Sequence, residues 1–590
     1  MENASGNALQ TADVAFEGDR CVSRRFGDVY FSADGPDEVR RVFLAPAAVA
    51  ERAQARDQPF TIAELGFGTG LNLVVAAAAT RARLHFVSFE GHPLSRADLA
   101  QALKPWRHDY PLVGALVAAY PPPVRGWHRR FFESGRVQLS VFFGDVGDGL
   151  TDLRQQQRRG VDAWFLDGFA PKRNPDMWRD ALFADIAALS APGATATTFS
   201  AAGDVRRRLA AHGFKVRRVD QRPHKRHSTA AVYAGTGRTF RAPREAVVVG
   251  AGLAGAATAR CLVHKGIAVT LLDRGQGVAS GASAIPAAVL HPRLLPTASV
   301  EGLYRLQAFL HAAAWLPGRD GVTPTGVLQL AGKREPSAGV REGEPLASKE
   351  PTRLRRVAAA IPDEIAAYTD PHAASELVGT TVRAPGLFFP NASMINGKAL
   401  ALHLVDDPNI AVLPELDTPP GTTVIRATGT DVAGFSHLEV GALAGQLDRF
   451  ACDRTPRLPI VGDGVIVPDT ASVWTGATYE YRAWDPDRAS EANAARYAGF
   501  FGTEPGPSLS RFRGTRAVTS DRLPVIGPDG DAWFNLGHGS HGTISAIFGA
   551  EIIASAVNGE LAPATCDIRA LLEPARFRAR QLRRPNPFRR

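Results

Sequence analysis

Short apolar runs alternate with longer, alanine-rich stretches through the first 240 residues of the chain. Five of these runs predict strands: FTIAEL (60–65), LHFVSFE (84–90), VQLSVFFGD (137–145), VDAWFLDGF (161–169) and ATATTFS (194–200). The stretches LNLVVAAAAT and PDMWRDALFADIAALS, which lie between strands, predict helices. This alternation predicts an α/β domain with a parallel, doubly wound, Rossmann-like sheet.

A second domain follows the polar, proline-containing segment TGRTFRAPR (236–244). The apolar run AVVVG then opens a new strand–turn–helix–strand unit, and mixed α/β patterning with many Gly and Pro turns continues to about residue 570. The chain of 590 residues exceeds the ~50–250 residues of a single domain. We therefore expect two domains, 1–240 and 241–590, the second with a mixed α+β substrate subdomain. The polar stretch 331–358 predicts a surface loop.

Basic residues are clustered, although the net charge of +9 is mild for this length. Arg206–Arg208, Arg217, Arg218 and RPHKRH (222–227) crowd one region, and the tail 576–590 holds seven arginines and no acid. Such clusters fit contact with the phosphates of a nucleic acid, and a solvated surface or end is the alternative. HKRH (224–227) fits a surface or an RNA contact better than a metal site.

Four scattered cysteines, Cys21, Cys261, Cys452 and Cys566, form no CxxC pair. We therefore expect free thiols in a reducing cytoplasm, with neither a disulfide framework nor a metal site. The N-terminus lacks the basic start and apolar core of a signal peptide, and no apolar run approaches the ~18 residues of a membrane span. These features predict a cytoplasmic protein without a membrane partner.

The first strand ends in the turn ELGFGTG, in which Glu64 is followed by Gly66, Gly68 and Gly70. Glycines let the backbone approach a ligand, and the helix that follows directs its N–H groups toward it. The spacing differs from the G-x-G-x-x-G turn that holds a pyrophosphate. It resembles the first motif of S-adenosylmethionine-dependent methyltransferases, which implies S-adenosyl-L-methionine as co-substrate; an ordinary strand–helix turn is the alternative.

Carboxylates end three further strands of this domain. Glu90 is placed to accept both hydroxyls of a ribose, and Asp145 stands where such methyltransferases contact adenine. Asp167 lies at the carboxyl edge of the sheet, where ligands of open α/β folds bind. If the methyl acceptor is an alkyl amine, with a pKa near ~10.4, it must lose a proton before it accepts a methyl group, and Asp167 is then the candidate catalytic residue. Each of these carboxylates could instead cap a helix or a turn.

The second glycine turn is GAGLAG, with Gly250, Gly252 and Gly255 in the G-x-G-x-x-G spacing between a buried strand and a small-residue helix. Asp273 ends the next strand, at the spacing that suits a carboxylate on the ribose of a dinucleotide. The turn therefore predicts a dinucleotide site.

Later segments favour FAD over NAD. RGQGVASGASAIPAAVLHP resembles the loop beside the flavin in glycine-oxidase and D-amino-acid-oxidase relatives, and TTVIRATG (422–429) resembles their return to the FAD fold. The turn GHGSHG, with Gly537, Gly539, Ser540 and Gly542, begins a helix whose N-terminus would face the flavin. Arg516 matches the arginine that clamps the substrate carboxylate in glycine-oxidase-like enzymes; a salt bridge to Asp521 is the alternative.

ELGFGTGLN, VDAWFLDGFAPKRNPDMW, VVVGAGLAGA, SGASAIPAAVLHPRL and GHGSHGT together resemble the MnmC family, the bifunctional tRNA 5-methylaminomethyl-2-thiouridine biosynthesis enzymes. The resemblance implies FAD-dependent conversion of 5-carboxymethylaminomethyl-(2-thio)uridine to the 5-aminomethyl form. Methylation by S-adenosyl-L-methionine then follows on the same nitrogen. It also implies the anticodon arm of tRNA as partner. Two alternatives stay open: a fusion acting on free small-molecule amines, and an N-terminal half that only binds RNA.

Overall fold

The computed structural model describes residues 7–224, 227–274, 277–332, 350–415 and 420–588, and the chain forms two compact units. The N-terminal unit comprises 8–242 together with the short segment 556–566. The C-terminal unit comprises mainly 243–555 and the stretch that starts at Asp567. The chain thus returns to the N-terminal unit after most of the C-terminal unit is complete.

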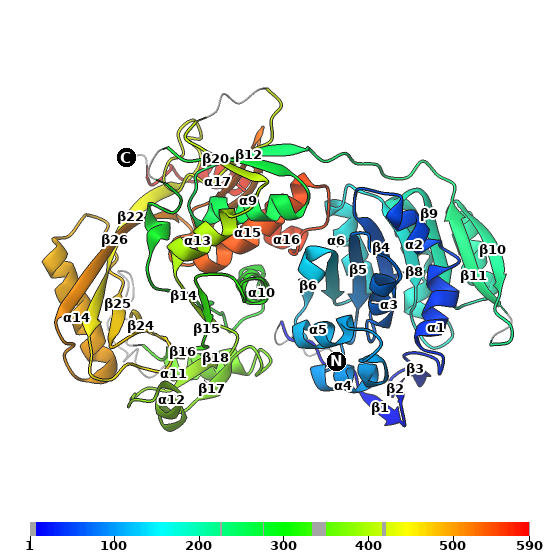
Figure 1. Cartoon of the computed structure of the whole chain (residues 1–590), viewed down its shortest axis with the longest axis horizontal. Helices are drawn as coiled ribbons and strands as arrows, with labels where there is room; N and C mark the ends of the chain where they lie inside the picture. The colour runs from blue at the N-terminus through cyan, green and yellow to red at the C-terminus, as the bar shows by residue number, and fades with distance from the viewer. Residues whose placement is uncertain (1–6, 225–226, 275–276, 333–349, 416–419, 589–590) are drawn as a thin grey trace. The chain divides into compact units, whose positions relative to one another are not determined.

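An eight-stranded sheet forms the middle of the N-terminal unit, in the order β10-β11-β9-β8-β4-β5-β7-β6 (Figure 1). Neighbouring strands from β9 to β7 are parallel: β9 (Ser190–Thr198), β8 (Val161–Leu166), β4 (Phe60–Leu65), β5 (Leu84–Glu90) and β7 (Val137–Phe143). The predicted parallel, doubly wound α/β sheet is confirmed. The sequence analysis did not predict the antiparallel pairings at the two sides, made by β6 (Gly126–Phe132), β10 (Phe214–Asp220) and β11 (His227–Tyr233).

Successive side chains on the central strands enter two separate hydrophobic cores, one on each face of this sheet. Ile62 and Phe86 pack with α3 (Leu71–Ala79), α4 (Arg96–Leu103) and α5 (Leu112–Ala119). Their neighbours Ala63 and Val87 pack with α6 (Val146–Gln156), α7 (Asp180–Leu189) and α8 (Gly203–Ala211). Burial on both faces explains why the strands read as nearly continuous apolar runs rather than as alternating patterns.

The segment 556–566 completes one of these cores. Leu561 is fully buried in the core that contains α6 and α7, and its carbonyl accepts a hydrogen bond from the buried Arg129. The amide of Cys566 donates to Oδ1 of Asp152 at 2.7 Å, and Gln156 donates to the carbonyl of Ala564 at 2.8 Å. The segment is therefore a structural part of the N-terminal unit, although it is distant in sequence.

The C-terminal unit contains a six-stranded sheet in the order β20-β13-β12-β21-β28-β27. Its parallel part comprises β20 (Ile410–Leu413), β13 (Ala268–Leu272), β12 (Glu245–Val249), β21 (Val424–Arg426) and β28 (Ala532–Leu536). β27 (Val525–Asp529) pairs antiparallel with β28. The predicted strands in AVVVG and TTVIRATG are β12 and β21. The helices that follow β12 and β28 are α9 (Leu253–His264) and α15 (Gly542–Val557).

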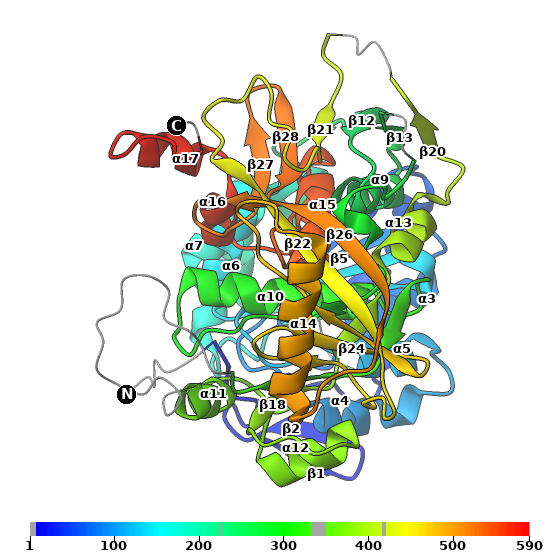
Figure 2. The same ribbon diagram turned by 90° about the vertical axis from the view of Figure 1, so that its left-hand side faces the viewer.

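A second, eight-stranded sheet in the order β17-β18-β16-β23-β24-β25-β22-β26 also lies in this unit and forms the predicted mixed α+β subdomain. Its six shorter strands are β17 (Ala367–Thr369), β18 (Gly386–Phe389), β16 (Val327–Leu330), β23 (Ile460–Val461), β24 (Val465–Asp469) and β25 (Ser472–Gly476). Its two long strands, β22 (Val440–Ala451) and β26 (Ser508–Thr519), pair antiparallel, and α14 (Pro486–Phe501) lies against them (Figure 2). The unit also contains a three-stranded sheet of β14 (Ala288–Leu290), β19 (Ser393–Ile395) and β15 (Val322–Pro324). Residues 350–358 form α11 (Glu350–Ala358), so the loop predicted for 331–358 is wrong there. Residues 333–349 lie outside the described part of the chain.

The arginine-rich tail is packed in part rather than solvated throughout. It contains α17 (Ala575–Gln581), in which Arg576 and Arg580 both pair with Asp521. Arg578 pairs with Asp529, and Arg584 pairs with the buried Glu439. Four of the seven arginines therefore have acidic partners inside the unit, so the alternative of a solvated end is wrong for α17, whereas residues 582–585 are exposed.

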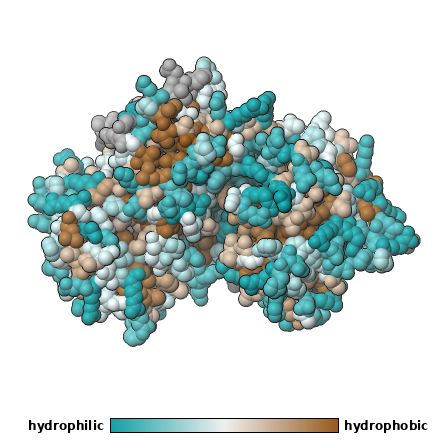
Figure 3. Space-filling view, in the orientation of Figure 1, coloured by the Kyte–Doolittle hydropathy of each residue, from teal (hydrophilic) through white to brown (hydrophobic). Residues whose placement is uncertain are grey.

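The face drawn in Figure 3 is mainly hydrophilic. Apolar side chains gather on it over β20 and α13 (Gly397–Val405), where Leu402, Val412 and Leu413 are exposed. Within the described ranges, no helix has both the length and the apolar character needed to cross a bilayer.

Candidate active sites

A cavity of about 390 Å³ lies at the carboxyl ends of the central strands of the N-terminal unit. Of the residues predicted from the sequence, Gly66, Gly68, Glu90, Asp145 and Asp167 line it. Gly70 precedes α3 with φ 70° and does not line the cavity. Four loops that follow different strands thus bring their residues to one edge of the sheet, where open α/β folds bind ligands.

The glycine turn after β4 has a conformation that disfavours side chains. Gly66 has φ 95°, and a Cβ placed there would lie 2.5 Å from the carbonyl oxygen of Asp167. Gly68 has φ 53°, and its Cβ would lie 3.1 Å from the ring of Tyr30. Because no side chain projects from these glycines, a ligand such as the methyl donor can approach the backbone of this turn closely.

We expect Gly66→Ala to unfold at a lower temperature and to bind S-adenosyl-L-methionine more weakly. A positive φ costs an alanine roughly 1 kcal/mol or more, and the contact with the Asp167 carbonyl forces the turn to move. Thermal unfolding and calorimetric titration measure the two effects. Gly114→Ala is the matched control, because Gly114 lies in α5 with nothing within 4 Å of its Cβ position. Equal behaviour of the two variants would contradict the role given to the turn.

Glu90 is held by the backbone on both sides of its carboxylate. Its Oε2 accepts the N–H of Gly68 at 2.8 Å, and its Oε1 accepts the N–H of His92 at 2.8 Å. Burial nevertheless raises the pKa of Glu90. Each oxygen keeps a lone pair for a further donor, which fits the two hydroxyls of a ribose.

Asp145 lines the cavity and also caps a helix, so the capping alternative is correct for this residue. Its Oδ1 accepts the N–H of Gly147 at 2.8 Å and that of Asp148 at 3.4 Å, at the first turn of α6. The cap fixes the carboxylate at the cavity edge.

Glu64 does not line the cavity, and the structure places it beneath the turn. It is fully buried, with Oε2 accepting from the Ser88 hydroxyl at 2.7 Å and Oε1 accepting from the Asn72 amide at 2.7 Å. Burial and, next, the charge of Asp167 raise the pKa of Glu64 well above its usual range. A ligand in the cavity therefore has no direct path to the Glu64 carboxylate.

Asn72 links Glu64 to the candidate catalytic residue. The same amide nitrogen that donates to Glu64 donates its second hydrogen to Oδ2 of Asp167 at 2.6 Å. The carboxylate of Asp167 is thereby held in one orientation at the cavity. The sequence analysis missed this residue, although it stands two positions after Gly70 in GTGLN.

An aromatic wall was also missed, because it comes from the N-terminal sheet of β1 (Val14–Glu17), β2 (Arg20–Ser23) and β3 (Asp28–Val29) and the loops beside it. Phe26 stacks on Phe169 with ring centroids 4.7 Å apart, and Tyr30 meets Phe169 edge-on at 5.4 Å. All three rings line the cavity, together with Asp167 and Gly168. A partly dry pocket of this kind strengthens interactions between charges.

The C-terminal unit has a larger cavity, of about 630 Å³. Gly250, Gly252 and Asp273 line one part, and Arg516 with the turn Gly537–Gly542 lines another. Gly255 does not line the cavity. A Cβ on Gly255 would lie 1.8 Å from the carbonyl oxygen of Gly250, so this glycine permits α9 to pack closely on the turn.

In the part of the chain that the structure describes, one carboxylate oxygen of Asp273 lacks a hydrogen-bond donor and could accept one from a ligand. Its Oδ2 is buried and has no hydrogen-bond partner among the described residues. A buried carboxylate oxygen without a partner is costly, and a ribose hydroxyl of FAD would supply the donor.

We expect Asp273→Ala to weaken FAD binding by roughly 10- to 100-fold, since a hydrogen bond to a charged group contributes about 1.5–3 kcal/mol. Flavin absorbance retained through gel filtration, and titration of the apoprotein with FAD, measure this loss. Asp531→Ala, at an exposed position of the same unit, should retain the flavin. Full retention by Asp273→Ala would show that this carboxylate does not hold the dinucleotide.

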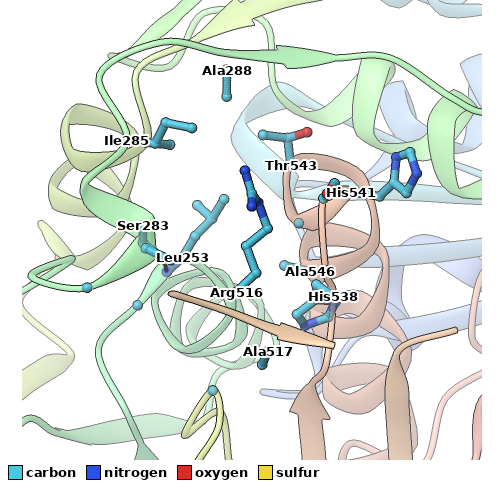
Figure 4. Close-up of a pocket in the computed structure, with 18 of the residues that line it drawn as sticks. Leu253, Ser283, Ile285, Ala288, Arg516, Ala517, His538, His541, Thr543 and Ala546 are labelled. Atoms are coloured by element: carbon cyan, nitrogen blue, oxygen red, sulfur yellow. Dashed lines mark hydrogen bonds between the residues drawn. The ribbon is translucent and has the colours of Figure 1, made fainter. Parts of the chain in front are cut away.

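Arg516 points into the cavity from β26, between the segment of Ser283 and Ile285 and the helix that carries Thr543 and Ala546 (Figure 4). Its Nη1 donates to the carbonyl of Thr478 at 3.2 Å, and its guanidinium lies 5.0 Å from the Tyr479 ring. Asp521 pairs with Arg576 and Arg580, so the alternative of an Arg516–Asp521 salt bridge is wrong. The guanidinium is thus available for a carboxylate ligand.

Histidines surround the same cavity. Burial lowers the pKa of His538 and of His541 to about 4, so both rings are neutral at pH 7. The Nδ1 of His538 lies 2.9 Å from the Ser545 hydroxyl near the start of α15, so this ring connects the glycine turn to the helix. His291, which was not predicted from the sequence, also lines the cavity, and its Nε2 has no partner among the described residues.

Throughout the residues that the structure describes, no group of three or more His, Cys, Asp or Glu side chains could hold a metal ion.

Comparison with known proteins identifies both units. The model of an S-adenosyl-L-methionine-dependent methyltransferase family matches 110–234, and that of an FAD dependent oxidoreductase family matches 245–409. The two domains therefore use S-adenosyl-L-methionine and FAD.

Proteins with both domains align over nearly the full chain. The tRNA 5-methylaminomethyl-2-thiouridine biosynthesis bifunctional protein MnmC of Chromobacterium violaceum is 35% identical, over 97% of this chain and 98% of its own. The protein of the same name from Ectopseudomonas mendocina is 33% identical over 95% and 96%. The glycine oxidase of Geobacillus kaustophilus is a more distant match, 18% identical with a TM-score of 0.45 over 54% of this chain and 96% of its own. The chain belongs to the MnmC family of bifunctional tRNA-modification proteins.

Proposed function

We propose that the chain performs two consecutive reactions on one nitrogen of the wobble uridine of tRNA. The C-terminal unit converts 5-carboxymethylaminomethyl-(2-thio)uridine to the 5-aminomethyl form, and the N-terminal unit methylates the exposed amine to the 5-methylaminomethyl form. The observation that carries the proposal is the pairing, in one chain, of a flavin cavity into which Arg516 points with a methyl-donor cavity lined by Asp167. A carboxylate must be gripped in the first reaction, and an amine must be deprotonated in the second.

In the first reaction, bound FAD supplies the two-electron oxidant. Arg516 binds the substrate carboxylate through its two N–H edges and so fixes the adjacent CH₂ group. Loss of a hydride from that carbon and of the N–H proton gives a substrate imine. Water then adds to the imine carbon, and the bond between this carbon and the nitrogen breaks. The products are glyoxylate and the aminomethyl nucleoside. Asp273 and the turns at Gly250 and Gly537 would hold the dinucleotide.

In the second reaction, Asp167 accepts the proton of the aminomethyl group. A primary ammonium with a pKa near ~10.4 is mostly protonated at pH 7, and its neutral form costs about 4–5 kcal/mol. Asn72 holds Oδ2 of Asp167 at 2.6 Å and so orients the carboxylate in the cavity. Glu90 and Asp145 would position the donor, whose sulfonium methyl is already activated, so orientation supplies most of the remaining help.

The partner in this proposal is the anticodon arm of tRNA, and the location is the cytoplasm. Arginines of α8 and β10, among them Arg207 and Arg217, are exposed on the N-terminal unit and fit phosphate contacts. All four cysteines are free, which fits a reducing compartment. Lys225 and Arg226 of the predicted HKRH cluster lie outside the described residues.

The test is mass spectrometry of wobble nucleosides after hypomodified tRNA is incubated with the purified protein. Without S-adenosyl-L-methionine the aminomethyl nucleoside and glyoxylate should accumulate, and with it the methylaminomethyl nucleoside should replace them. Turnover of free small-molecule amines with tRNA left unchanged would favour the alternative fusion enzyme. Oxidation without methylation would favour an N-terminal unit that only binds RNA.

A further inference from the structure

One exposed tyrosine lines the flavin cavity, and a second lies two residues farther along the chain. Tyr479, which lines the cavity, is 51% exposed, and Tyr481 is 71% exposed. Among the large apolar residues that are exposed in the described ranges, only these two and Phe588 are aromatic. Exposed aromatic surface beside a cavity marks a binding surface, because water solvates it poorly.

The backbone places both rings on the same side. Glu480, between them, exchanges hydrogen bonds with Ala444 of β22 at 2.9 and 3.2 Å, so the segment is extended. The Glu480 side chain is buried and accepts from Arg513 at 2.6 Å and from Thr478 at 2.6 Å. Because side chains alternate along an extended chain, Tyr479 and Tyr481 both point away from the side that Glu480 occupies.

The two tyrosines differ in what holds them. Tyr479 is occupied: its ring packs on the Arg516 guanidinium, and its hydroxyl lies 3.1 Å from Oγ of Ser540. Among the residues that the structure describes, the Tyr481 side chain has one hydrogen bond, at its edge, where its hydroxyl accepts from Arg522 at 2.6 Å. A ring fixed at the edge keeps its faces accessible, which is the arrangement that stacking requires.

The spacing of Tyr479 and Tyr481 along the backbone is comparable to the length of the 5-carboxymethylaminomethyl side chain. The carboxylate carbon of a 5-carboxymethylaminomethyl group is separated from the uracil ring by four bonds, so a carboxylate held at Arg516 leaves the ring several ångströms away. Along an extended chain, residue 481 lies about 7 Å beyond residue 479. With Tyr479 against Arg516, we infer that a ring about 7 Å farther along the chain is within reach of the uracil base.

The charges around this ring fit RNA. Arg482 is exposed beside Tyr481 and has no partner within the described part of the chain, whereas the nearest acid in sequence, Glu480, is buried and paired with Arg513. Base stacking on an aromatic ring next to a free cation is the usual mode of binding unpaired nucleotides. We propose that Tyr481 is a stacking platform for the wobble base during oxidation, with Arg482 at the adjoining phosphate; the proposal rests on the function proposed above.

Fluorescence anisotropy with two synthetic anticodon stem–loops tests the platform. One RNA carries 5-carboxymethylaminomethyluridine at the wobble position, and the other has an abasic wobble nucleotide. We expect Tyr481→Leu to weaken binding of the first RNA by about 5- to 100-fold and to leave binding of the abasic RNA unchanged. Tyr481→Trp and Tyr481→Phe should stay within about threefold of the wild type, since both keep a ring for stacking.

Leu509→Ala, at an exposed apolar position of β26, is the control and should bind both RNAs as the wild type does. Unchanged flavin absorbance and thermal unfolding of Tyr481→Leu exclude a folding defect. Equal losses on both RNAs, or no loss on the first, would overturn the platform, as would a wild type that binds both RNAs equally. The proposed function fails separately, if the wild type releases no glyoxylate from the modified stem–loop.

Discussion

Asp167→Asn should lower the rate of methyl transfer by about 10²–10⁴-fold and leave the oxidation intact, so that the 5-aminomethyl nucleoside accumulates. An amide cannot accept the proton of the ammonium, and general base catalysis contributes a factor of this size. The substitution preserves the side-chain volume, and a carbonyl oxygen at this position can still accept from Asn72. Binding of S-adenosyl-L-methionine should therefore change little. Mass spectrometry of the wobble nucleosides and calorimetric titration of the donor check the two halves of this result.

The pH dependence of the methylation rate distinguishes a general base at Asp167 from a carboxylate that only positions the substrate. Below a pKa of ~10.4 the neutral fraction of the amine rises tenfold for each pH unit. The deficit of Asp167→Asn should therefore shrink as the pH rises, because solution then supplies the neutral amine. Asp57→Asn, at an exposed position of the same unit, is the control. A deficit that is constant with pH would assign Asp167 a positioning role.

The predicted strands of the N-terminal unit agree closely with the structure, because strands buried on both faces carry a continuous apolar signal. FTIAEL and LHFVSFE correspond to β4 and β5 residue by residue. The edge strands gave no comparable signal. In β10, six of the seven residues are partly or fully exposed and are basic, acidic or β-branched, so the segment does not resemble a buried strand.

The site could be predicted only where it is local in sequence. Glycine turns and strand-end carboxylates are recognised by their position after an apolar run. Asn72 could not be recognised in this way, since its function depends on two carboxylates, Glu64 and Asp167, that come together only in the folded sheet. The same limit explains Glu64, whose position at the end of β4 did not reveal that its side chain turns into the core.

The segment 556–566 shows why domain boundaries could be predicted only in part from the sequence. Its residues follow α15 without a polar linker, and their partners, Arg129, Asp152 and Gln156, lie some four hundred positions earlier. Local composition contains no information about contacts at that separation. A boundary near residue 240 therefore describes where the second βαβ unit begins, but not where the N-terminal unit is complete.

Arg516→Met should lower kcat/KM for oxidation of the carboxymethylaminomethyl tRNA by roughly 30- to 4000-fold, which corresponds to about 2–5 kcal/mol for a lost partner of a buried charge pair. Arg516→Lys keeps the charge but loses the fork of two N–H donors, so its defect should be smaller but distinct. Flavin content should be unchanged in both variants, because the nearest contacts of Arg516 are Thr478 and Tyr479. Steady-state release of glyoxylate measures the defect. Arg454→Met, at an exposed position of the same unit, should behave as the wild type.

A substrate analogue without the negative charge tests whether Arg516 binds the carboxylate directly. The wild type should strongly prefer a carboxymethylaminomethyl stem–loop over its neutral carbamoylmethyl analogue, since only the former offers a charged, bidentate acceptor. In Arg516→Met this preference should collapse, because both substrates then lack the partner. Methylation of a stem–loop that already carries the aminomethyl group should proceed normally, since that reaction needs no carboxylate. A variant that kept the preference would move recognition of the carboxylate to another group of the cavity.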